Sequence, residues 1–250
     1  MIKFFRHIRR SLINDNKMGK YIKYAIGEII LVVIGILIAL QINNWNENKK
    51  NEAKLKTYIL EFRNDLKLNL LIFEDEQKRA KARINNNTNL LKTKDFSAIP
   101  VDSLEKLIET FYINFDTKNF VYESFKNSQI TEFGKYDSIV NNMQVYYIWV
   151  YSELSDYVKQ HNNTVDLADN YWRYEQTDYE FSYGNDAETH YQTEQERKTK
   201  LISLIQNAKT RNILKIDNRK KKQYLGRIDQ LIELTQGNIN LINKTLELDD

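Results

Sequence analysis

The side chains that most often carry catalysis or bind metals are scarce in this chain. It has no Cys, so thiolate catalysis, disulfide bonds and Cys-ligated metals are excluded. Its 3 His residues, His7, His161 and His190, lie far apart. Neither His161 nor His190 follows a Glu by three residues, as His ligands in helical carboxylate metal sites do. We therefore expect no metal site and interpret the His residues as solvated surface groups.

Motifs for nucleophilic catalysis and phosphate binding are also missing. The sequence has no G-x-S-x-G nucleophile elbow and no G-x-x-x-x-G-K or G-x-G-x-x-G phosphate loop. Neighbouring acids such as Glu74, Asp75 and Glu76 are more typical of a charged helix face than of a catalytic pair. The sequence therefore predicts no catalytic residues, no cofactor and no enzymatic activity.

Glu28 is an acid at the edge of a long apolar run. It directly precedes Ile29–Leu40, twelve residues without a polar side chain. An acid inside a membrane is a candidate for pairing with a partner helix or for proton transfer. Alternatively, Glu28 extends to the cytoplasmic face of the bilayer and has no further role.

Small residues in the same run predict a helix-association face. Gly35 and Ala39 have the small-x-x-x-small spacing that lets two helices approach closely, and Gly27 lies about two turns before Gly35. The alternative is a helix that only anchors the chain.

A basic run, Arg219–Lys222, lies near the C-terminus, with Arg211, Lys215 and Arg227 close by. Nucleic-acid-binding domains show such patches but are commonly basic overall, whereas the chain after residue 23 has more acids than bases. We therefore expect no nucleic-acid partner. Two interpretations stay open: a solvated helix start, which we favour, or a patch facing an anionic membrane or an acidic partner.

Residues 171–191 combine aromatic with acidic side chains. Arg173 is their only Lys or Arg, and the aromatic residues are Tyr171, Trp172, Tyr174, Tyr179, Phe181, Tyr183 and Tyr191. Such a segment either forms a ligand or partner surface or packs over the end of a helical bundle. We favour packing.

A membrane-spanning helix would position Glu28 and the small residues. Tyr24–Ile42 is about 19 residues with only Glu28 and Gln41 strongly polar, close to the roughly 20 residues that cross a bilayer. Ten of the twelve residues in Ile29–Leu40 are Ile, Leu or Val, which favours insertion by roughly 3–6 kcal/mol.

Aromatic residues flank this segment as interface anchors. Tyr21, Tyr24 and Trp45 suit the headgroup level of a bilayer, and Tyr21 and Trp45 would lie about 36 Å apart along a helix. A buried core helix is one alternative. A cleaved signal peptide is another, although Leu37 is a poor residue for the −3 position. We predict an uncleaved signal anchor over residues 21–45.

Charge predicts the orientation. Residues 1–23 hold seven Lys/Arg and one acid, a charge of +6, so the other 30 basic and 33 acidic residues carry −3 of the total +3. The positive-inside rule places the N-terminus in the cytoplasm. The first 13 residues fit either a basic amphipathic helix on the anionic inner leaflet or a short solvated tail.

Two stretches resemble a known family. Gly27–Glu47, GEIILVVIGILIALQINNWNE, after the basic start MIKFFRHIRR, is similar to an uncharacterised flavobacterial-type family of single-span membrane proteins. A weaker likeness covers about residues 118–150, from Tyr122–Ser128 through Tyr146 and Tyr147. After Ser128, members tend to have a Gly where this chain has Gln129. The resemblance implies a membrane protein with a domain of unknown function and supplies no catalytic residues.

Helical periodicity dominates the chain after the span. Only 7 Gly and 1 Pro are present, too few for the turns of a β-sandwich or barrel. Asp102 and Glu105 have the spacing of a capping box, Gly134 precedes a helix to about Tyr174, and a helix resumes near Gln195. Apolar residues at steps of three and four begin with Leu55, Tyr58, Ile59, Phe62, Leu66, Leu70 and Phe73.

The predicted fold class is all-α: one N-terminal transmembrane helix followed by an antiparallel helical bundle with long amphipathic helices. We expect a basic cytoplasmic segment over residues 1–20, the signal anchor over 21–45, and an extracytoplasmic helical domain over 46–250. The predicted location is the inner (cytoplasmic) membrane of a bacterial cell envelope, single-pass, with the C-terminal domain periplasmic.

The expected function is a membrane-anchored module for protein interaction or assembly. Its partners would be the lipid bilayer and either a membrane or envelope protein or a second copy of the chain. The alternative is a ligand-sensing helical domain that signals through a partner in the membrane, since helical bundles can bind ligands between their helices.

Overall fold

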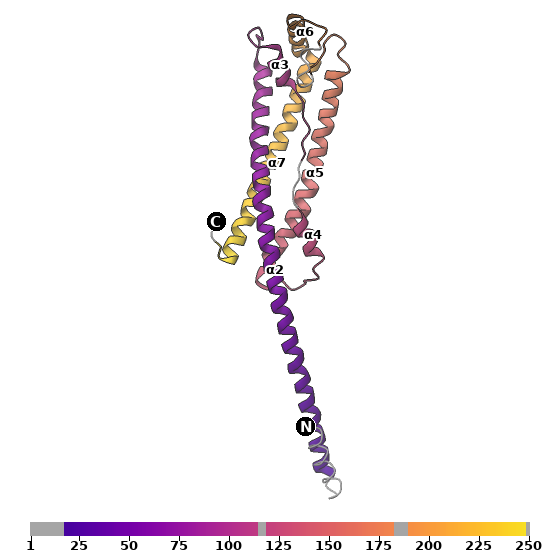
Figure 1. Cartoon of the computed structure of the whole chain (residues 1–250), viewed down its shortest axis with the longest axis vertical. Coiled ribbons are helices and arrows are strands. Elements are labelled where there is room, and N and C mark those ends of the chain that lie inside the picture. The colour runs from indigo at the N-terminus through magenta and orange to yellow at the C-terminus, as the bar shows by residue number, and fades with distance from the viewer. Residues whose placement is uncertain (1–17, 115–118, 183–189, 249–250) are drawn as a thin grey trace. The chain divides into compact units, whose positions relative to one another are not determined.

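The computed structural model describes residues 18–114, 119–182 and 190–248, and every regular element in them is helical. This confirms the all-α class. The elements, labelled as in Figure 1, are α2 (Met18–Lys92), α3 (Val101–Ile108), α4 (Phe120–Lys126), the short 3₁₀ helix η1 (Gly134–Tyr136), α5 (Asp137–Arg173), α6 (Glu194–Gln206) and α7 (Ala208–Leu246). The first 13 residues, for which a basic amphipathic helix and a short solvated tail both stay open, lie outside the described residues.

The chain divides into two compact units, Met1–Thr57 and Tyr58–Asp250. In the first unit, α2 carries the apolar run, and its large side chains between Ile29 and Ile42 are 47–64% exposed. In the described part of the chain, α2 is the one helix long and apolar enough to cross a membrane, by length and composition. This finding is compatible with a single-pass membrane protein.

In the second unit, the rest of α2 lies side by side with α5 and α7 (Figure 1). Hydrogen bonds join α2 to α7 from Arg63–Asn243 (2.5 Å) through Gln77–Asp229 (2.7 Å) to Asn87–Asp217 (2.7 Å). The residue numbers rise along α2 and fall along α7. These two helices therefore run in opposite directions.

Helix α5 is held to both neighbours by buried tyrosines. Tyr146 receives a hydrogen bond from Asn69 of α2 (3.3 Å) and one from Thr235 of α7 (3.4 Å), and Tyr147 donates to Asp65 of α2 (2.8 Å). Near the other end of α5, Tyr171 is hydrogen-bonded to Thr210 of α7 (2.8 Å). α5 therefore runs parallel to this part of α2 and opposite to α7.

The described part of this unit has a core that includes two clusters. In the first, the fully buried Phe62 packs on Tyr146 and Tyr147, with ring centroids 5.8 and 5.5 Å apart. The second lies where α3 and α6 meet α5 and includes Leu104, Tyr171, Trp172, Tyr179 and Leu201. Much of the aromatic segment therefore packs, as favoured from the sequence, although Tyr174 and Tyr191 are exposed.

The predicted capping box at Asp102 and Glu105 is wrong. α3 begins after Pro100 without a side-chain cap, and Glu105 instead points to Arg197 of α6 and Tyr179. A capping box does form before α6, where Thr193 accepts from the Glu196 amide and the Glu196 carboxylate accepts from the Thr193 amide.

Gln129 adopts the left-handed backbone conformation, with φ of 59°. This is the position where the resembling family tends to have Gly, which takes a positive φ without strain. Gln129 therefore keeps the left-handed backbone conformation that suits Gly, although it has a side chain.

Candidate functional site

The predicted helix-association face lies on α2 in the first unit. At about 100° per residue, Gly35 and Ala39 are about 40° apart around the helix, while Gly27 is about 80° from Gly35. Apart from the neighbouring residues and backbone of the helix itself, no atom lies within 4 Å of where a Cβ on Gly27 or Gly35 would stand. Gly35 and Ala39 thus form the centre of an open face, and Gly27 lies towards its edge.

The predicted interface anchors flank the apolar run. Tyr24 and Trp45 are exposed and lie about 32 Å apart along α2, and the ammonium of Lys49 lies 4.1 Å from the Trp45 ring centroid. The side chain of Tyr21 lies outside the described residues. Glu28 is half-buried on the same helix.

The interpretation of His161 as a solvated residue is wrong. It is 4% exposed, and its Nε2 lies 3.1 Å from the carbonyl oxygen of Phe111. Since a carbonyl can only accept, Nε2 carries the proton. Burial lowers the pKa of His161 below its ordinary value, so the ring is neutral at neutral pH.

The side chain of His190 is also buried, with Nε2 3.0 Å from the hydroxyl of Ser182, and His7 lies outside the described residues. Within residues 18–114, 119–182 and 190–248, no three His, Asp or Glu side chains are grouped so as to hold a metal ion.

A buried polar cluster surrounds His161 and joins α2, α5 and α7. Glu76 and Arg83 of α2 approach within 3.4 Å, and Lys221 and Asp217 of α7 within 2.5 Å. Burial raises the pKa of Glu76 against the opposing effect of Arg83, and burial lowers the pKa of Arg83. The charged form of each group is therefore disfavoured by desolvation and supported by its partner.

Phe111 connects these ion pairs to His161. The Arg83 guanidinium stacks over the Phe111 ring, and the Lys221 ammonium lies 5.3 Å from the ring centroid. The His161 ring packs on Phe111, with centroids 5.8 Å apart, and on Tyr224, at 6.2 Å. Charged and aromatic groups from three helices and one loop thus form a single connected cluster.

Sequence reasoning missed Lys221 because it lies within a basic run. Lys221 is 6% exposed, whereas Arg219 and Lys222 are exposed, so the expected solvation is wrong for Lys221. The run is also not a helix start, because α7 begins at Ala208 and continues through it. The spacing of Lys221 from apolar residues in the sequence could have identified it as buried. Lys221 belongs to the buried series of α7 at steps of three and four: Leu214, Asn218, Lys221, Tyr224, Ile228 and Leu231.

A second polar network joins α3, α6 and the loop after α5. The buried Arg197 donates to Glu105 (2.8 Å) and to Ser182 (2.8 Å), and the Tyr179 hydroxyl donates to the same Glu105 carboxylate. Burial alone would raise the pKa of Glu105, but these donors outweigh it and hold the pKa below its ordinary value.

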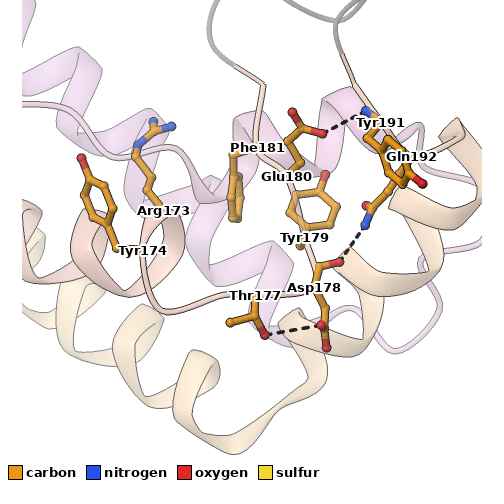
Figure 2. Close-up of a pocket in the computed structure, with 9 residues that line it drawn as sticks. All are labelled: Arg173, Tyr174, Thr177, Asp178, Tyr179, Glu180, Phe181, Tyr191 and Gln192. Carbon is orange, nitrogen blue, oxygen red and sulfur yellow. Dashed lines mark hydrogen bonds between the residues drawn. The ribbon is translucent and has the colours of Figure 1, made fainter.

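A pocket of about 500 Å³ opens beside this network (Figure 2). Figure 2 shows Tyr179 and Phe181 between Tyr174 and Tyr191, with Glu180 accepting from the Tyr191 amide (3.0 Å). Its aromatic lining is Tyr and Phe without Trp. The volume lies within the range of small-molecule sites, and five of the nine lining side chains are polar or charged.

The sequence matches one known family. The profile described as "Family of unknown function (DUF6090)" matches residues 28–165, more than half of the chain. The chain belongs to this family. This confirms the expected domain of unknown function.

The DUF6090 match covers α2 from Glu28, all of α3, α4 and η1, and α5 as far as Val165. Arg83, Phe111 and His161 therefore lie inside the DUF6090 region, whereas Lys221 and the Figure 2 pocket lie outside it. The comparisons with curated proteins and with solved structures found no match.

Proposed function

We propose that this chain is a membrane-anchored helical module for protein interaction or assembly, without enzymatic activity. In this proposal it is a single-pass protein of the inner membrane in a flavobacterial-type envelope. Residues 1–20 are cytoplasmic, 21–45 span the bilayer, and 46–250 form a periplasmic helical bundle in which α7 is antiparallel to α2 and α5. The observation that carries the proposal is the exposed apolar run on α2.

The exposure of this run favours its insertion into a bilayer. A soluble protein buries an apolar helix in its core, but the large residues of Ile29–Ile42 are about half exposed. Ten Ile, Leu or Val residues favour a membrane by roughly 3–6 kcal/mol. A bilayer supplies the apolar surroundings that the first unit lacks.

The proposed assembly contact is the face around Gly35 and Ala39. Small residues let a second helix approach closely within a bilayer, and the position of a Cβ on Gly35 is open. The partner is a second copy of this chain or another single-span envelope protein.

Reporter fusions at the C-terminus test the topology. Alkaline phosphatase is active only outside the cytoplasm, and green fluorescent protein exported in unfolded form does not fluoresce there. We expect phosphatase activity without fluorescence. Fluorescence without phosphatase activity would overturn the orientation and place the bundle in the cytoplasm.

Single-Cys scanning tests the assembly. Because the chain has no Cys, each introduced thiol reports one position. Oxidation in native membranes should cross-link Ala39→Cys to itself or to a partner. The matched control Leu37→Cys lies about 160° around the helix and should stay monomeric. Equal cross-linking, or none together with no co-purifying partner, contradicts the assembly role.

The pocket of Figure 2 favours a second candidate, a ligand-sensing domain. Tyr174, Tyr179 and Tyr191 line it, and an output would need a partner helix in the membrane. A thermal-shift screen of small aromatic and amine compounds on the full chain in detergent tests this candidate. A hit that Tyr191→Ala abolishes supports sensing, and an empty screen removes it.

A further inference from the structure

A second pocket, of about 310 Å³, lies between α2, α3, the segment 109–111 and α7. Its lining includes three cations, Arg83, Lys106 and Lys221, with Asn87, Phe111 and one acid, Glu109. We propose that this pocket binds a small oxyanion, a phosphate or carboxylate group, between Arg83 and Lys221.

The two inner cations are held in place before a ligand arrives. Lys221 is 6% exposed and anchored to Asp217 at 2.5 Å, while the guanidinium carbon of Arg83 lies over the Phe111 ring. Asp217 also accepts from Asn87 (2.7 Å), which ties α2 to α7 at this level. Little side-chain entropy remains to be lost when a ligand binds.

The two acids that pair with Arg83 and Lys221 do not line the cavity, whose one described acid is the exposed Glu109. Glu76 and Asp217 face Arg83 and Lys221 from outside the lining set. The Glu76–Arg83 contact is long, 3.4 Å from Nη1, and it engages one of the five N–H donors of the guanidinium. The planar fork of Arg83 therefore retains donors for a carboxylate or phosphate, which it matches in geometry.

Size and polarity restrict the ligand. The volume of the cavity is at the lower end of the range for small-molecule sites. The apolar residues of its described lining are Leu107 and Phe111, and the Arg83 guanidinium already covers the Phe111 ring. Lys106 and Glu109 are exposed at its edge. A compact polar anion fits this lining, and a large apolar molecule does not.

Calorimetric titration of the full chain in detergent tests the proposal, with inorganic phosphate and succinate as probes and chloride at matched ionic strength as the reference. We expect saturable binding of at least one probe. The probe that binds tells whether the site takes phosphate or carboxylate. The absence of saturable binding for both probes would overturn the proposal.

Variants locate the site. Lys221→Met and Arg83→Gln should each weaken binding at least tenfold. The matched control Lys222→Met, one residue along α7 and exposed, should leave affinity unchanged. Since Lys221→Met leaves Asp217 without its ion pair, the double variant Lys221→Met/Asp217→Asn keeps the charge balanced and should also lose binding. Unchanged affinity in a folded double variant would refute the assignment.

Discussion

Replacing Tyr179 by Phe tests whether the network around Glu105 stabilises the loop after α5. Tyr179 is 5% exposed, and its ring packs edge-on against Phe181 with centroids 4.7 Å apart. Phe keeps that packing and removes only the hydroxyl that donates to Glu105. Any loss of stability therefore reports the hydrogen bond.

The expected loss of stability depends on the hydrogen bonds that Glu105 keeps in the variant. A hydrogen bond to a charged group contributes about 1.5–3 kcal/mol. Arg197 still donates to the carboxylate at 2.8 Å, so the variant does not create the unpaired buried charge that costs about 3–5 kcal/mol. We expect the free energy of unfolding to fall by about 2 kcal/mol and Tm by about 4–8 °C.

Thermal and urea unfolding of the full chain in detergent would measure this change. The matched control is Tyr191→Phe, because Tyr191 is 97% exposed and its loss should cost under about 0.5 kcal/mol. If Tyr179→Phe is no more destabilising than Tyr191→Phe, the network does not stabilise the fold.

The pH dependence gives an independent readout. Burial acts to raise the pKa of Glu105, but hydrogen bonds from Tyr179, Ser182 and Arg197 hold it below its ordinary value. The ionised carboxylate therefore contributes stability that is present at neutral pH and is lost as pH falls through the folded-state pKa. Removing the Tyr179 hydroxyl raises that pKa, so acid unfolding should begin at a higher pH. Unchanged acid unfolding would contradict the assignment.

Three further predictions test other parts of the chain. Gln129→Gly should stabilise the fold by about 0.5–1 kcal/mol in urea unfolding. Gly removes the strain of the left-handed conformation at φ of 59°, but it also makes the unfolded chain more flexible, which cancels part of this stabilisation. Burial depresses the pKa of His161, so wild-type stability should decline as pH falls below the unfolded value of about 6.5, and His161→Gln should flatten Tm between pH 7 and 5. Ile34→Arg should raise the fraction of the protein that carbonate extraction releases from membranes. Inserting an Arg at the centre of a membrane costs about 2.5–3.5 kcal/mol.

Each of these has a matched comparison. Gln129→Ala keeps a Cβ at the same φ and should not stabilise. In the His161 test, a variant that keeps the wild-type pH slope would show that another group carries it. Leu71→Arg changes an exposed residue of the second unit and should leave carbonate extraction unchanged. Equal release by Leu71→Arg and Ile34→Arg would contradict a membrane role for the apolar run.

The helices were predictable because their periodicity is local. Steps of three and four along α2, α5 and α7 follow directly from 3.6 residues per turn, so the buried faces could be predicted from spacing alone. The capping box failed for a non-local reason. Asp102 and Glu105 satisfy the local pattern, but Glu105 gains a buried Arg197 that is 92 residues away in sequence, and that pair outcompetes a helix cap.

The same limit explains the oxyanion pocket. Arg83, Phe111 and Lys221 come from three separate segments, and their meeting depends on the register of α2 against α7, which the hydrogen bond between Asn87 and Asp217 marks. In a basic run on an amphipathic helix, some member must fall on the apolar face, because that face recurs every three to four residues. The buried series places Lys221 there, so a charge there must find a partner or a ligand. In the free protein, the ion pair with Asp217 supplies the partner that the buried Lys221 needs. The cavity lined by Lys221 lies beside this pair, so a bound anion and Asp217 would both contact the Lys221 ammonium.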